Sequence, residues 1–189
     1  MADSAQHWRD DAPERGFARW LYLAVASRLP FRAIRGDQGE PYLERYYLGR
    51  FLGQTWYLHR FLASDPDRGL HDHPWRVSRS LILSGVYLEI RQQAGSLFEI
   101  RRRFWPLRIN RIDGGTRHRI ILPSGGEAWT IFSHGARTKG WGFYRSAADG
   151  GLRYHPYAID ARDHDPDLWE KLPSRRKGGT GSPQTNIKY

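Results

Sequence analysis

Between residues 44 and 145, short segments rich in Tyr, Trp, Ile, Leu and Phe alternate with Gly, Pro, Asp or Ser. The expected strand segments are 44–51, 54–62, 80–91, 97–105, 107–112, 117–122, 128–132 and 140–145. Many short strands with turn residues between them predict an all-β sandwich or barrel. At 189 residues, the chain has the usual length of one domain with one hydrophobic core.

A helix is predicted before the strand-rich region. Over residues 15–29, apolar side chains recur at helical spacing, and Pro30 ends the pattern. This amphipathic helix should pack against the β-rich body through Phe17, Trp20, Leu21, Ala24 and Val25. We divide the chain into an N-terminal arm and helix (1–40), a barrel (41–160), a short helix (161–173, with its core at 165–172) and a flexible basic tail (174–189).

The chain is strongly basic, with 30 Lys and Arg against 20 Asp and Glu and a formal net charge of +10. Most basic residues are Arg scattered along the sequence. The segment after Leu172 adds Arg175, Arg176, Lys177 and Lys188 without an acid. This distribution favours a solvated surface and tail over a nucleic-acid interface, although the tail keeps nucleic acid open as an alternative partner.

The chain contains no cysteine, which excludes disulfides, zinc–thiolate sites and cysteine nucleophiles. Any metal ion must therefore be held by nitrogen and oxygen ligands. The longest apolar stretches fall far short of the ~18 residues that a membrane span needs. The N-terminus has no basic-then-apolar signal pattern, so we expect a cytoplasmic protein.

Three histidines form a candidate metal site. On a strand, His71 and His73 are two residues apart and point to one face, and Pro74 ends the pairing after them. His118 follows a glycine turn and leads into another strand. Three neutral imidazoles across a small β-barrel would suit Fe(II), Mn(II), Ni(II), Zn(II) or Co(II), with open positions for substrate or water.

These motifs resemble those of the cupin superfamily. The first cupin motif is matched by His71-x-His73-x4-Ser78-x6-Gly85, and the second by Asp113-x-Gly115-x2-His118-x3-Leu122. The resemblance covers roughly residues 44–146. The sequence His-Asp-His-Pro-Trp is similar to that of small bacterial and phage cupin-like proteins. The resemblance implies an RmlC-like double-stranded β-helix barrel, or jelly roll. Because cupins commonly pair through β-strands, it also implies a possible homodimer.

One departure from the cupin motifs bears on the metal. Ser78 occupies the position of the motif's glutamate, so the usual carboxylate ligand is missing. Cupins that keep three histidines without this glutamate include thiol dioxygenases, which use Fe(II) to activate O2. The resemblance therefore implies a site of His71, His73 and His118 with Fe(II) as the favoured ion, and it admits a dioxygenase.

Other polar residues are candidates for completing the site. Glu89 is a candidate displaced ligand or general base, and it shares a strand face with Tyr87. Arg60, Arg119 and Arg117 are candidates for holding a substrate carboxylate or phosphate through a bidentate fork. His59 is a candidate for the cavity wall or for the core. Asp65, Asp67 and Arg68 are interpreted as shaping the loop before His71.

Three functions remain open from the sequence. The first is a non-haem Fe(II) oxygenase acting on a small polar or anionic molecule. The second is a metal-dependent isomerase, epimerase or lyase on the same barrel, in which Glu89 or Tyr87 moves a proton. The third is a non-catalytic cupin that binds a ligand or nucleic acid through its Arg-rich strand and tail.

Overall fold

The computed structural model describes residues 7–36, 39–66, 69–92, 98–147, 151–157, 169 and 171–179. Several expectations fall outside these residues. They are the loop positions Asp67 and Arg68, most of the helix expected over 165–172, and residues 180–189 of the tail.

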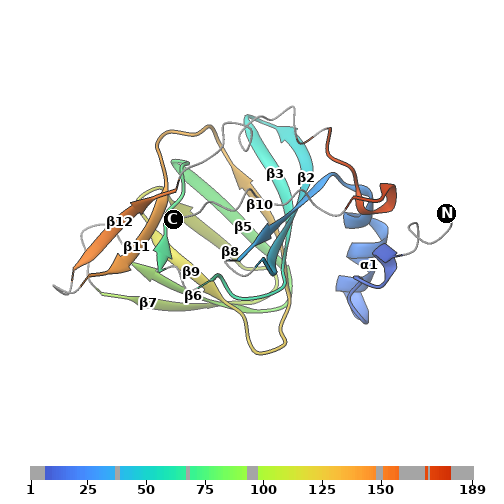
Figure 1. Cartoon of the computed structure of the whole chain (residues 1–189), viewed down its shortest axis with the longest axis horizontal. Helices are drawn as coiled ribbons and strands as arrows, with labels where there is room; N and C mark the ends of the chain where they lie inside the picture. Colours follow the sequence, from blue (N-terminus) through green and yellow to red (C-terminus); the bar gives the residue numbers. More distant parts are fainter. Residues whose placement is uncertain are drawn as a thin grey trace.

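The described residues form two six-stranded sheets whose neighbouring strands are antiparallel (Figure 1). The first sheet has the order β1 (Phe31–Arg35), β2 (Pro41–Phe51), β3 (Gln54–Phe61), β10 (Ala128–His134), β5 (Val77–Ser84) and β8 (Ile109–Asp113).

The second sheet has the order β12 (Leu152–Pro156), β11 (Gly142–Ser146), β4 (Leu70–His71), β9 (Arg117–Ile121), β6 (Tyr87–Gln92) and β7 (Ile100–Phe104). The all-β class predicted from the sequence is confirmed, and the strands pair into two sheets.

The two sheets share one hydrophobic core. A cluster of buried side chains draws members from both of them: Leu43, Phe61, Ile82, Tyr87, Phe104, Ile120, Leu122 and Ala128. Period-two alternation explains this placement, because every second residue of a strand faces the opposite sheet.

The segment 80–91, expected as one strand, is divided between the sheets. β5 pairs with β10 in the first sheet, whereas β6 pairs with β9 in the second. Gly85 lies at the crossing with φ of +77°, and a Cβ there would collide with the backbone oxygen of Glu127. A glycine is needed at this point because L side chains rarely adopt that conformation and the neighbouring backbone leaves no room.

The predicted N-terminal helix is present but shorter than expected. α1 (Gly16–Ala24) follows a 3-10 turn, η1 (His7–Arg9), and leads into a second one, η2 (Ala26–Arg28). Leu21 and Tyr22 pack on the first sheet against Tyr46 and Trp129, whereas Phe17 and Trp20 are about half exposed. None of the helices in the described ranges has the length and apolar character needed to cross a membrane.

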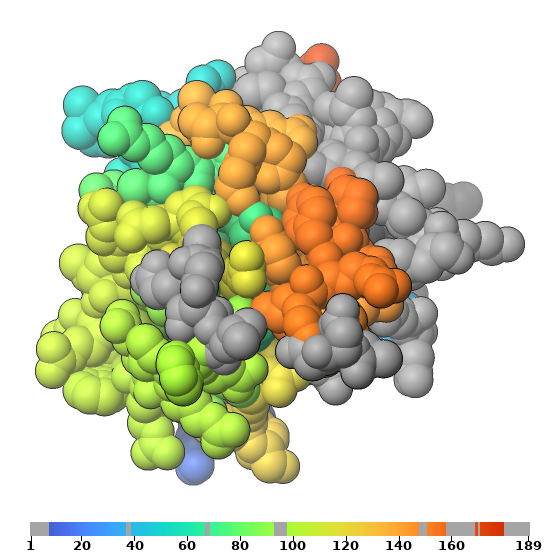
Figure 2. All heavy atoms as spheres, turned by 90° about the vertical axis from the view of Figure 1, so that its left-hand side faces the viewer, coloured from blue at the N-terminus to red at the C-terminus, as the bar shows by residue number. Residues whose placement is uncertain are grey.

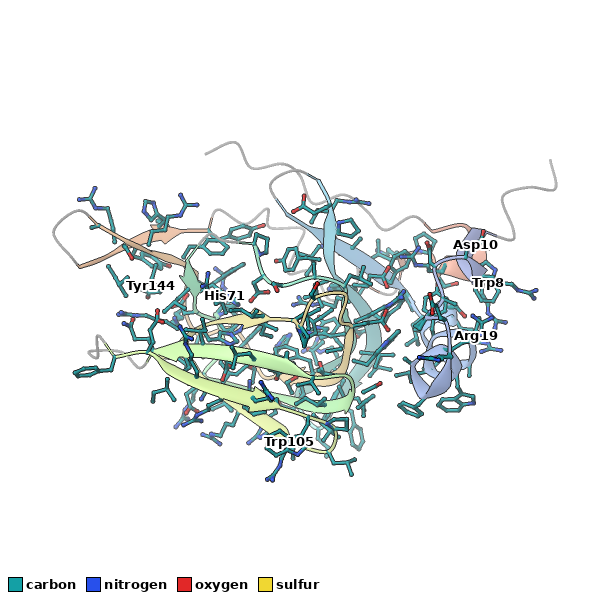
Figure 3. All side chains as sticks on the ribbon, turned by 90° about the horizontal axis from the view of Figure 1, so that it is seen from below. Trp8, Asp10, Arg19, His71, Trp105 and Tyr144 are labelled. Carbon is teal, nitrogen blue, oxygen red and sulfur yellow. The ribbon has the colours of Figure 1, made fainter. Side chains whose placement is uncertain are left out.

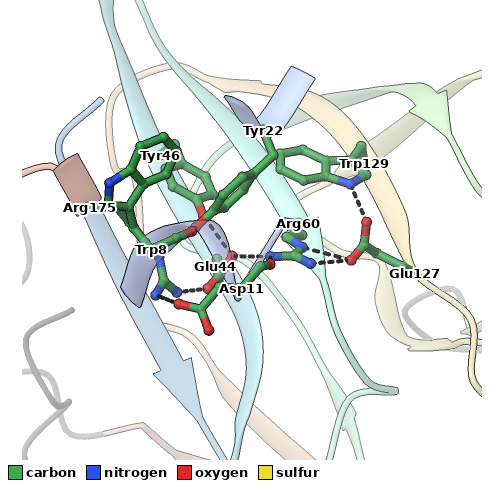
Figure 4. A network of polar contacts seen from close by, with 9 residues as sticks. All are labelled: Trp8, Asp11, Tyr22, Glu44, Tyr46, Arg60, Glu127, Trp129 and Arg175. Atoms are coloured by element: carbon green, nitrogen blue, oxygen red, sulfur yellow. Dashed lines mark hydrogen bonds and ion pairs between the residues drawn. The ribbon is translucent and has the colours of Figure 1, made fainter. Parts of the chain in front are cut away.

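Residues 174–179, expected in a flexible tail, are held against the first sheet. Ser174 pairs with Pro30, and η4 (Arg175–Lys177) follows. Arg175 contacts Glu44 and Asp11, as Figure 4 shows. Arg176 Nε donates to Ser27 Oγ at 2.9 Å. The physical reason is charge pairing, since Glu44 is a buried carboxylate that needs cationic partners.

Candidate metal centre

The structure brings His71, His73 and His118 together. His71 ends the two-residue strand β4, and its register partner on β9 is His118. The ring centroids of His71 and His118 are 4.6 Å apart, and those of His73 and His118 are 5.0 Å apart. One ring nitrogen from each histidine lies within 4.8 Å of the others, so the group could hold a metal ion. Figure 3 shows His71 at the end of its short strand.

The nitrogen atoms of this cluster are oriented as ligands. His118 Nδ1 lies 2.7 Å from Glu89 Oε1, and its other nitrogen, Nε2, lies 2.8 Å from Nε2 of His73. Because the Glu89 carboxylate can only accept, Nδ1 carries a proton, and Nε2 of His118 is the nitrogen that points toward His73 and that a metal ion would use. A divalent ion fits this arrangement. It would bind Nε2 of His73 and Nε2 of His118 in place of the direct contact between these two atoms.

The electrostatics favour the neutral imidazoles that a metal requires. Burial lowers the pKa of His71 and His73 well below the ordinary histidine value, and the neighbouring His118 lowers both further. Neutral rings have the free lone pair that coordination uses. Burial therefore favours the ligand form of His71 and His73.

Glu89 lies behind His118 rather than in the cavity wall. It is fully buried and accepts hydrogen bonds from Arg91 Nε at 3.0 Å and from Asn110 Nδ2 at 2.9 Å. Burial alone would raise its pKa, but His118, Arg91 and Asn110 lower it to about 2. Glu89 is thus an ionised carboxylate that fixes the orientation and tautomer of a candidate ligand. Ser78, at the motif's glutamate position, is buried and its Oγ makes no hydrogen bond to a described residue.

Replacing Glu89 with Gln should weaken metal binding by about 10–100-fold, as is typical when the carboxylate behind a ligating histidine is lost. Glutamine keeps the shape but loses the charge that sets the tautomer of His118. A competition titration against a chromogenic chelator measures the change. Glu99→Gln, an exposed position before β7, is the matched control and should keep the wild-type affinity. Equal affinities for both variants would show that Glu89 does not position a ligand.

The three histidines line a cavity of about 140 Å³ between the sheets. Many of the other lining residues are aromatic. Phe132 stacks on His59 with ring centroids 4.8 Å apart, and the ring centroids of Trp141 and Tyr157 are 4.4 Å apart. The remaining lining includes Phe61, Phe143, Ile112 and Ile120. The cavity therefore offers a small, mostly apolar space beside the nitrogen cluster.

The other residues predicted from the sequence are divided between the cavity and positions outside its lining. Tyr87 lines the cavity, its hydroxyl accepts from Asn110 Nδ2 at 3.3 Å, and burial raises its pKa. Arg60 lies on the opposite face of β3 from His59, and its Nε donates to Glu127 Oε2 at 2.7 Å. Arg119 alternates with His118 and Ile120 on β9, and it is not among the described residues that line the cavity. The structure therefore brings Tyr87 to the histidines, but not Arg60 or Arg119.

Arg45 was missed as a cavity residue by the sequence reasoning. It lines the cavity, donates from Nε to His59 Nε2 at 3.0 Å, and lies 5.2 Å over the ring of Tyr57. Burial and the charge of Arg45 lower the pKa of His59. Arg45 pairs with His59 across β2 and β3. The sequence does not show this register, so it gave no signal for Arg45 as a cavity residue.

Asp65 also lines the cavity, whereas the sequence suggested only a loop role. Its Oδ2 accepts a hydrogen bond from the Ile120 N–H at 2.7 Å and lies 3.9 Å from His71 Nδ1. Burial raises the pKa of Asp65 to about 6, against the lowering effects of the Ile120 N–H and His118. Asp65 thus places a carboxyl group beside the histidine cluster.

No protein-family model matches the sequence, and no curated protein matches it either. Among solved structures, the fold is similar to that of a DMSP lyase, with a TM-score of 0.52 and 15% identity over 77% of this chain and 80% of that chain. A cupin-superfamily sugar phosphate isomerase from Silicibacter pomeroyi DSS-3 gives a TM-score of 0.48 and 12% identity, covering 74% of this chain and 95% of that one.

A hydroxypropylphosphonic acid epoxidase from S. wedmorenis gives a TM-score of 0.45 and 12% identity over 58% of this chain. That match spans 56% of the epoxidase chain, little more than half its length. At these identities, the similarities concern the fold alone.

Proposed function

We propose that this chain is a metal-dependent cupin enzyme, a non-haem Fe(II) oxygenase that acts on a small anionic molecule. The observation that carries the proposal is the convergence of His71, His73 and His118 in the lining of a small cavity. Imidazole ligands suit Fe(II) and other divalent first-row ions. Fe(II), when bound, would supply the one-electron chemistry that makes O2 reactive.

The chain's own residues have separable roles in this proposal. Glu89 keeps the proton on Nδ1 of His118 and its Nε2 available. The aromatic side chains near the histidines, Phe132 and Trp141 among them, limit water around the reacting atoms. Asp65 and Tyr87 reach the same space and could hold or move a proton.

The position of Arg45 is the reason for proposing an anionic substrate. Among the described residues that line the cavity, it is the one Lys or Arg. Its electrostatic effect reaches His73, so the cation lies within range of the candidate metal ligands. A carboxylate, phosphonate or similar group paired with Arg45 would leave the rest of a small molecule beside the histidines.

The test measures oxygen consumption by the protein reconstituted with Fe(II), in the presence of each member of a panel of small carboxylates, thiol acids and phosphonates. At least one compound should stimulate uptake. Arg45→Met should raise the KM for that compound by about 10–100-fold, the loss of a charge-assisted hydrogen bond, with bound iron unchanged. Arg79→Met, at an exposed position on β5, is the matched control. Iron-loaded protein that consumes no O2 with any compound would contradict an oxygenase.

A metal-dependent lyase or isomerase is the second candidate. It is favoured by Asp65 and Tyr87, because a carboxyl and a phenol in one cavity form an acid and base pair that needs no O2. Turnover of a panel compound under anaerobic conditions would select this candidate over the oxygenase.

A further inference from the structure

A second hollow, of about 400 Å³, lies on the surface near the histidines. Its wall is formed by the link between β4 and β5, the turn between β8 and β9, and the segment that enters β11. Figure 2 shows these segments, green, yellow-green and orange, next to one another on one face. We propose that this hollow binds the phosphoryl group of a small molecule. The lining residues are Asp72, Arg76, Gly114, Gly115, Arg117, Thr138, Lys139 and Tyr144.

The charge of the hollow fits a phosphoryl dianion. Arg76, Arg117 and Lys139 contribute three cations, and Asp72 is the one acid among the described lining residues. The Asp72 charge is already paired, because Oδ2 contacts Lys139 and Oδ1 accepts from the Gly142 N–H at 2.9 Å. Two guanidinium charges therefore remain uncompensated at the hollow, which matches the charge of a phosphate monoester.

The donors are of the type that recognises phosphoryl oxygens. Arg76 and Arg117 each present a planar fork that can hold two oxygens of one group. The guanidinium of Arg117 lies 4.2 Å from the centre of the Tyr144 ring, which orients it. The Tyr144 hydroxyl donates a hydrogen bond to Asp72 Oδ2 at 3.3 Å.

The rim of the hollow is tied together by backbone hydrogen bonds. The Gly114 N–H donates to Arg76 O at 2.9 Å, and the Thr138 N–H donates to Pro74 O at 2.8 Å. A Cβ on Gly114 would lie 2.7 Å from Trp75 O, so only glycine lets the two segments approach this closely. A preformed rim lowers the ordering cost of binding. The two uncompensated guanidinium charges suit one phosphoryl group rather than the successive phosphates of a polymer.

The test is a titration of the full-length chain with inorganic phosphate, followed by amide NMR at constant ionic strength. Saturable shifts should appear at Gly114, Gly115 and Tyr144. Arg76→Met should weaken binding at least about tenfold, as the loss of a charge-assisted contact predicts. Arg79→Met, which removes an exposed arginine of β5 outside the hollow, should leave it unchanged.

Two further ligands identify the source of the phosphoryl group. A sugar phosphate should shift the same amides at least as strongly as inorganic phosphate does. A single-stranded oligonucleotide should not bind more tightly than inorganic phosphate. Shifts outside the hollow, equal binding by Arg76→Met, or binding of the oligonucleotide alone would each overturn the proposal.

Discussion

Replacing His73 or His118 with alanine is expected to abolish stoichiometric metal binding. The ring nitrogens of these histidines lie 2.8 Å apart, and with His71 they are the candidate ligands of the cluster. With two imidazoles left, the loss of affinity should exceed the about 10–100-fold effect expected for the residue behind a ligand. Metal content after dialysis, with competition titration against a chelator, measures the loss.

Two variants are needed because His118 is only 1% exposed and its removal takes one of its hydrogen-bond partners from the buried Glu89. For His73, the one side-chain hydrogen bond described is the contact with His118, so His73→Ala should disturb the fold less. His155→Ala, on β12 and outside the cavity lining, is the control. Folded His73→Ala protein that keeps a full complement of metal would rule out the cluster as the binding site.

Replacing Glu44 with alanine is expected to lower the free energy of unfolding by about 3–5 kcal/mol. Glu44 is 2% exposed and accepts from the Tyr46 hydroxyl at 2.6 Å, while Arg60 and Arg175 form ion pairs with it. Figure 4 shows this network between the first sheet and the terminal segments. Without Glu44, two largely buried guanidinium groups lose a counter-charge in a region of low dielectric.

Urea denaturation followed by circular dichroism gives the unfolding free energy. Glu14→Ala, an exposed position before α1, is the control and should stay within about 0.5 kcal/mol of wild type. Arg175→Met should have a smaller effect than Glu44→Ala, because Arg60 would still compensate Glu44. A Glu44→Ala effect below about 1 kcal/mol would mean that water or other groups already solvate this network.

Much of the fold and the histidine cluster could be predicted because both depend on local period-two alternation. His71 and His73 share a face by spacing alone, and a glycine turn placed His118 at the start of a strand. Period-two alternation also shows which other candidates cannot face the cavity. Arg60 follows His59 on β3, and Arg119 follows His118 on β9, so adjacent residues cannot both face the cavity.

The roles of Arg45 and of the terminal segment could not be predicted, because they depend on contacts between distant parts of the chain. Arg45 meets His59 through the register of β2 and β3, which shifts between Tyr47 and Gly49. The contact of Arg175 with Glu44 spans 131 positions. The local composition around Arg175 is that of a linker, and only the folded chain places a buried carboxylate beside it.

The most direct test of the account is the metal content of the wild-type chain after reconstitution with Fe(II) under anaerobic conditions and removal of excess ion. The account predicts about one tightly held ion per chain, lost in His73→Ala and kept in His155→Ala. Substoichiometric metal in the wild type, or equal metal in wild type and His73→Ala, would contradict a three-histidine centre.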